Sequence, residues 1–102
     1  MAVSVQNSTD STQVTISVSQ QFDYSLHQAF RDAYRNVKTA GTTFKVDLFR
    51  ATYMDSSALG MILLLKEHAD KLGGNVVISK PNESVHKILT IANFDQFVTI
   101  ES

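Results

Sequence analysis

Hydrophobic and polar residues alternate along two stretches of the chain, residues 13–19 and 43–49. Alternation with a period of two is typical of a strand with one buried face and one wet face. The residues expected to point into the core are Val14, Ile16, Val18, Phe44, Val46 and Leu48. Residues 76–78 are apolar throughout, which predicts a strand covered on both faces. Shorter strands are expected at residues 3–8 and 98–100.

Apolar residues at helical spacing predict a first helix from residue 26 to about residue 38. Ser25 and Gln28 form the S-x-x-Q pattern of a capping box, in which the two side chains satisfy free N–H groups at the helix start. Gly41 is expected to end this helix, because glycine adopts the left-handed backbone conformation without strain.

Two more helices are predicted in the second half of the chain. One runs from residue 57 to about residue 72, where Gly73 and Gly74 stop it. The other is capped by Asn82 and ended by Asn93. The loop before each of them contains the polar residues that helix starts require.

The order of the elements predicts an α/β fold. After a leading pair of strands, joined by a turn at residues 9–11, helices and strands alternate. Such alternation implies parallel strands with right-handed crossovers, and the leading pair can add an antiparallel edge. We therefore expect a mixed, mostly parallel sheet of four to five strands with three to four helices packed on it. Residues 1–102 show no linker, repeat or low-complexity segment, so a single domain is expected.

Composition excludes several classes of function. The formal net charge is -1 and the basic residues are scattered, so bulk electrostatics gives no nucleic-acid surface. The absence of cysteine removes disulfides, thiolate metal sites and thiol nucleophiles. The N-terminus lacks the pattern of a secretory signal, and no apolar run approaches the roughly 20 residues of a membrane span. A cytoplasmic protein without a membrane segment is expected.

The most informative stretch is Asp55-Ser56-Ser57, directly before the most apolar segment of the chain. These residue types satisfy the free N–H groups at a helix start. A helix N-terminus also favours negative charge, so a hydroxyl there can receive a phosphoryl group. A plain helix cap without chemistry is the alternative interpretation of the same residues.

One side of the helix that follows carries apolar residues beyond the stripe needed for the core. At 100° per residue, Met61 and Leu64 point away from that stripe, on the side of Ser57 and Gly60. This pattern predicts either a docking surface or a second buried neighbour. A partner that contacts Met61 and Leu64 would also interact with a charge placed on Ser56.

These motifs resemble the signature of the STAS-domain anti-sigma factor antagonists. That family has an apolar-Asp-Leu strand followed by a D-S-[ST]-G-L-G turn into a helix, which residues 46–48 and 55–60 match. Phe22-Asp23 is similar to the family's pair before its first helix, and the order of elements matches along essentially the whole chain. Ala58 departs from the pattern, because the family usually has glycine there.

The resemblance implies a function in partner switching and a set of site residues. The serine after the aspartate, Ser56 here, is the family's phosphoacceptor, and Ser57 is the alternative. The unmodified antagonist would bind an anti-sigma factor that is also a serine kinase and so free a sigma factor, phosphorylation would release it, and a PP2C-type phosphatase would reset it. The residues expected to contact the partner are Asp23, Asp55, Ser57, Gly60, Met61 and Leu64. No cofactor or metal is implied, and a monomer is expected.

The same residues bear on other classes of function. A hydrolase would need a base beside Ser56 or Ser57 and an elbow such as G-x-S-x-G, which is absent, so no enzymatic activity is expected. The three histidines at positions 27, 68 and 86 lack the spacing of paired metal ligands. Asp47 is a weaker candidate that fits a simple strand residue. The main alternative is a non-catalytic STAS subunit of a membrane transporter or signalling scaffold. Nucleotide binding is a further alternative, but the sequence contains no phosphate-binding loop.

Overall fold

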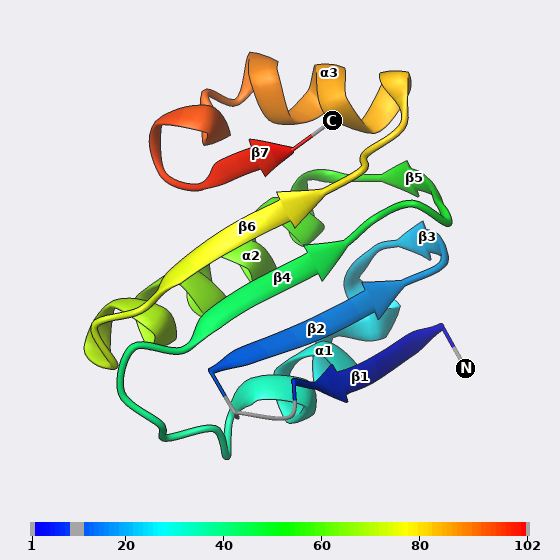
Figure 1. The fold of residues 1–102 in the computed structure, drawn as a ribbon. Helices are drawn as coiled ribbons and strands as arrows, with labels where there is room; N and C mark the ends of the chain where they lie inside the picture. The colour runs from blue at the N-terminus through cyan, green and yellow to red at the C-terminus, as the bar shows by residue number, and fades with distance from the viewer. Residues whose placement is uncertain (1, 9–11, 102) are drawn as a thin grey trace.

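The main sheet of the protein has five strands in the order β1-β2-β4-β6-β7 (Figure 1). The computed structural model describes residues 2–8 and 12–101, so the turn expected at residues 9–11 lies outside the described residues. The strands are β1 Val3–Asn7, β2 Gln13–Val18, β4 Thr43–Asp47, β6 Asn75–Ser79 and β7 Thr99–Glu101. Among the strands of the described residues, only β1 and β2 pair antiparallel. The mixed, mostly parallel sheet is therefore confirmed.

The described chain has three α-helices, within the expected three to four: α1 His27–Tyr34, α2 Ser56–Lys71 and α3 Glu83–Ile91. Figure 1 shows α1 and α2 behind the sheet, on the same face, and α3 beside the β7 edge. The alternating residues named above as core-facing are all buried, at 3% exposed or less. The apolar side chains of these strands therefore face the helices. The polar side chains that alternate with them lie on the other face of the sheet.

Strand β6 does not have two covered faces. Val76 and Ile78 are buried under the helices, but Val77 is only half-buried on the opposite face. There it lies in register between Lys45 and Thr99. The expectation of a strand covered on both faces was wrong, because no helix of the described chain packs on this side (Figure 1). The apolar run reflects one half-buried valine among polar neighbours.

A small second sheet was not predicted. β3 Gln20–Phe22 pairs in parallel with β5 Ala51–Met54. Both strands are too short to show a hydrophobic period, so the sequence suggested only a loop before each helix. This sheet is nevertheless what joins the starts of the first two helical segments.

The first helix begins and ends differently from the prediction. Asp23, not Ser25, caps a short 3-10 turn, η1 Tyr24–Leu26, and α1 itself has no side-chain cap, so the capping box was wrong. The helix ends at Tyr34 rather than near residue 38. Beyond it, the N–H of Val37 donates to the carbonyl oxygen of Tyr34 at 2.9 Å, and the carbonyl oxygen of Val37 lies 2.7 Å from Nε2 of the His68 ring.

Gly41 does not end this helix, although it has the expected positive φ of 77°. Its N–H donates to the carbonyl oxygen of Leu72 at 2.7 Å, which ties the loop before β4 to the end of α2. Gly41 is seven residues beyond the last residue of α1. The left-handed residue was predicted correctly, but its role was not.

The other helix boundaries agree with the sequence. Asp55 caps α2 and Asn82 caps α3, each accepting a backbone N–H from three residues ahead. Gly73 has a φ of 68° just after α2, and Asn93 adopts the left-handed conformation after α3. The last helix is followed by a 3-10 turn, η2 Phe94–Gln96.

Candidate functional site

Two helical segments begin side by side because β3 and β5 are paired. The register matches Phe22 with Met54, and the N–H of Asp55 donates to the carbonyl oxygen of Phe22 at 3.4 Å. The strands run in the same direction, so Asp23 and Asp55 leave the small sheet at the same end. The two aspartates singled out in the sequence are thus brought together by the fold.

Asp55 holds the start of α2. Its backbone is extended, and its Oδ1 accepts the N–H of Ala58 at 3.2 Å and the hydroxyl of Ser57 at 2.5 Å. Ser56 is therefore the first residue of the helix, where free N–H groups and the helix dipole favour negative charge. The interpretation of Asp55 as a helix cap is confirmed.

The Asp23 turn repeats this arrangement. Oδ1 of Asp23 accepts the N–H of Ser25 at 3.0 Å and the Ser25 hydroxyl at 2.5 Å. An Asp-x-Ser turn thus occurs twice, with Tyr24 in the position that Ser56 occupies in the other turn. Tyr24 is 66% exposed, and its ring stacks on that of His27 with centroids 4.9 Å apart. Tyr24 was missed from sequence, although the repeated Asp-x-Ser spacing was visible.

The two candidate hydroxyls differ in what they contact. The Ser57 hydroxyl is half-buried and donates to Asp55, so it must break that bond before it can react. The Ser56 side chain is exposed, and its hydroxyl has no hydrogen-bond partner among the described residues. An external reagent therefore meets the Ser56 hydroxyl first.

The pKa of the Asp55 carboxyl is lowered from its ordinary value. The hydrogen bond from the Ser57 hydroxyl is the largest cause, burial acts in the opposite direction, and the backbone N–H of Ala58 lowers the pKa further. All of these hydrogen bonds favour the ionised carboxylate. Asp55 is therefore negatively charged beside Ser56 at neutral pH.

Replacing Ser57 with alanine is expected to raise the pKa of Asp55 toward its ordinary value. Ionised Asp55 stabilises the fold above the pKa of the unfolded chain, and this contribution is lost as the pH falls through the lower folded-state pKa. The variant should therefore lose less stability on acidification. NMR titration of the side-chain carboxyl measures the shift, with Ser25→Ala as the matched control in the other turn. An unchanged Asp55 pKa in Ser57→Ala would contradict the assignment.

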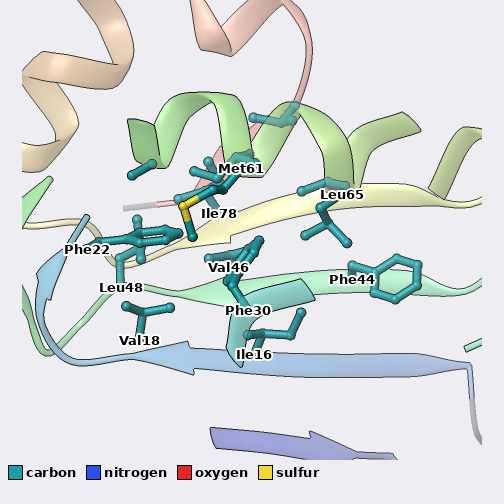
Figure 2. Close-up of a cluster of buried hydrophobic side chains, with 14 of the residues drawn as sticks. Ile16, Val18, Phe22, Phe30, Phe44, Val46, Leu48, Met61, Leu65 and Ile78 are labelled. Carbon is teal, nitrogen blue, oxygen red and sulfur yellow. The ribbon is translucent and has the colours of Figure 1, made fainter. Parts of the chain in front are cut away.

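The outer side of α2 is only partly as predicted. Leu64 is 48% exposed and Gly60 is exposed, in agreement with a free surface. Met61 is 4% exposed, so its expected place on that surface was wrong. Helix α1 packs beside α2, and Figure 2 shows the Met61 side chain among the core residues near Phe22. The sequence predicted either a docking surface or a second buried neighbour, and for Met61 the second alternative is correct.

Asp47 belongs to a different part of the molecule. It lies at the end of β4 with its side chain on the open face of the sheet, since the flanking Val46 and Leu48 point into the core. Its Oδ1 accepts the N–H of Phe49 at 3.0 Å, and its Oδ2 accepts the hydroxyl of Ser17 at 3.4 Å. These bonds shape the turn after β4, which agrees with a structural strand residue.

No base is hydrogen-bonded to Ser56 within the described chain, although a serine nucleophile needs one. The rings of His27 and His68 are engaged elsewhere, by Tyr24 and by the Val37 carbonyl. Among residues 2–8 and 12–101, no group of three or more His, Asp or Glu side chains is placed to hold a metal ion. In the same residues, every helix is too short or too polar to cross a membrane.

Comparison with known proteins gives consistent matches. The profile of a family described as the Mlab STAS domain matches residues 5–100. A STAS-domain containing protein of Pseudomonas aeruginosa (strain UCBPP-PA14) is 43% identical over 100 residues, which cover 98% of this chain and 99% of that protein.

Solved structures resemble the fold at lower identity. The anti-sigma factor antagonist SpoIIAA in its unphosphorylated form is 19% identical, with a TM-score of 0.71 over 99% of this chain and 87% of that chain. The Bacillus cell fate determinant SpoIIAA in the phosphorylated form is 17% identical, with a TM-score of 0.69 over 99% of this chain and 92% of that chain. A sulfate transporter family protein from Wolinella succinogenes is 11% identical, with a TM-score of 0.77 over 93% and 84%.

Proposed function

Because this chain belongs to the STAS-domain family, we propose that it is an anti-sigma factor antagonist controlled by phosphorylation of Ser56. The unmodified protein binds an anti-sigma factor that is also a serine kinase, and thereby frees a sigma factor. Phosphorylation by that partner releases the antagonist, and a PP2C-type phosphatase restores it. The observation that carries the proposal is the exposed, unbonded Ser56 hydroxyl at the start of α2.

The release step follows from local electrostatics. A phosphate adds about -1.5 to -2 charge beside Asp55, with Asp23 at the end of the neighbouring strand. The free N–H groups of α2 stabilise this charge, so the fold tolerates it. SpoIIAA has this same fold in structures of both its unphosphorylated and its phosphorylated form. At the interface the same charge would have to lose its water without a partner, which disfavours the complex.

Gly60 supports a close approach of the partner to α2. A glycine inside a helix costs about 0.5–1 kcal/mol relative to alanine, and a Cβ built here would meet nothing within 4 Å. The fold therefore gives no reason for a missing side chain at this exposed position. Together with Ser57 and Leu64 on the same side of the helix, Gly60 forms the part of the surface that the partner contacts.

Mass spectrometry of the protein from its native cells tests the proposal. The intact mass of the wild type is expected to include one phosphate in part of the population, located on Ser56 by peptide analysis. Ser56→Ala should lose this phosphate and Ser57→Ala should retain it. A wild type that stays unmodified through growth and stress would refute the proposal, and phosphate that persists in Ser56→Ala would refute the choice of acceptor.

A second candidate function is a non-catalytic STAS subunit of a membrane transporter or signalling scaffold. The likeness to the sulfate transporter family protein shows that the same fold is present in a protein of that description. This alternative requires no phosphate on Ser56. An unmodified wild type that co-purifies with a membrane protein would favour it.

A further inference from the structure

A groove of about 410 Å³ lies between α1 and α2 on the outer side of the helical layer. Its residues come from both helices and are polar or charged, except for Leu64 and the aromatic ring of Tyr34. Those that carry the argument are Arg31, Arg35, Leu64, Glu67 and Lys71. Tyr34 and His68 lie deeper, since Tyr34 is 6% exposed and His68 half-buried.

The charge of the groove is opposite in sign to that of the chain. Three of the nine basic residues line it against one acidic residue, whereas the whole chain has a formal net charge of -1. Arg35 pairs with Asp32 at 3.2 Å. Arg31 and Lys71 make no ion pair with any described residue, so both charges remain available to a ligand.

The groove is held rigid by contacts beneath it. The Tyr34 ring packs against His68 with centroids 5.2 Å apart, and Nε2 of His68 lies 2.7 Å from the Val37 carbonyl oxygen. These contacts fix α1 relative to α2 without using the side chains of Arg31 or Lys71. A preorganised surface of this kind binds with a smaller loss of conformational freedom.

The groove is continuous with the surface that begins at Ser56. Leu64 follows Ser57 and Gly60 along one side of α2, and Lys71 lies two turns beyond it. At 1.5 Å per residue, Lys71 is roughly 22 Å from Ser56 along the helix. An interface of ordinary size covers about 800 Å² on each partner, so one partner can occupy both regions.

We propose that this groove binds an acidic, amphipathic segment of the same partner that phosphorylates Ser56. Apolar side chains of that segment pack on Leu64, and its carboxylates pair with Arg31 and Lys71. The proposal rests on the proposed function, and it adds the chemical character of the partner. Charge attraction of this kind raises the association rate and weakens with salt.

Charge reversal in the groove tests the proposal. Arg31→Glu and Lys71→Glu, alone and together, are compared with Lys87→Glu, which makes the same charge change on the exposed side of α3. The rate at which newly made protein acquires phosphate on Ser56 in its native cells is followed by intact mass. We expect the double variant to be at least about tenfold slower than wild type, and Lys87→Glu to be unchanged.

Two results would overturn the inference. If wild type is phosphorylated and the double variant keeps pace with Lys87→Glu, the groove plays no part in recognition while the proposed function stands; a wild type that is never modified refutes the proposed function itself. In a second assay, sedimentation with vesicles of phosphatidylglycerol and phosphatidylethanolamine is expected to leave the protein in solution. Vesicle binding that the double variant loses would assign the groove to a membrane surface instead.

Discussion

Ser56→Asp is expected to bind the anti-sigma factor partner tens- to thousands-fold more weakly than Ser56→Ala, roughly the effect of a few kcal/mol. The alanine variant keeps a small uncharged side chain at the start of α2 and should bind constitutively. The aspartate variant places a fixed negative charge next to Asp55, where the interface would have to desolvate it. The fold should be unaffected, because a helix start accommodates negative charge.

The comparison requires both variants as baits in extracts of the native cells. One protein should be enriched on Ser56→Ala and lost on Ser56→Asp, and calorimetry with that protein then gives the ratio of dissociation constants. Ser84→Asp is the matched control, because Ser84 is an exposed serine in the first turn of α3. Equal binding by the two Ser56 variants would rule out release by charge.

Gly74→Ala should destabilise the fold by on the order of 3 kcal/mol or more. A Cβ at this position would lie 1.9 Å from the backbone carbonyl oxygen of Thr42. Neither the backbone of Gly74 nor the carbonyl group of Thr42 can easily move. The Thr42 carbonyl accepts the N–H of Asn75 at 3.3 Å, and the N–H of Gly74 donates to Ala69 at 2.9 Å.

Urea unfolding measures the effect, with Gly60→Ala as the control. That variant adds the same methyl group in open space within a helix, so it should gain about 0.5–1 kcal/mol. The same substitution is therefore expected to lower the free energy of unfolding at Gly74 and to raise it at Gly60. Similar stabilities for the two variants would mean that Gly74 is not restricted by Thr42.

Sequence patterns predicted the features that depend on neighbouring residues. The alternation in β2 and β4, the caps at Asp55 and Asn82, and the helix ends at Gly73 and Asn93 are all set within a few residues. The Asp55-Ser56-Ser57 turn was found for the same reason. The comparisons then confirmed the family resemblance along nearly the whole chain.

Features that depend on distant parts of the chain were not predicted. Strands β3 and β5 are too short to show a hydrophobic period, so their pairing could not be predicted. Met61 looked free because only the packing of the folded chain shows that it is buried. The capping box failed because Asp23, two residues earlier, already binds Ser25. The exposure of Tyr24 beside the site depends on the same pairing and was missed with it.

The pairing of β3 with β5 also determines when the site comes into existence during synthesis. Its two halves are about thirty residues apart in sequence, and contacts of that separation form only after the intervening chain has been made and has collapsed. A nascent or unfolded chain carries the Asp55-Ser56-Ser57 sequence but not its neighbouring turn. The two neighbouring turns therefore exist only in the folded protein, and a partner that contacts both Asp23 and Asp55 would distinguish folded molecules from unfolded ones.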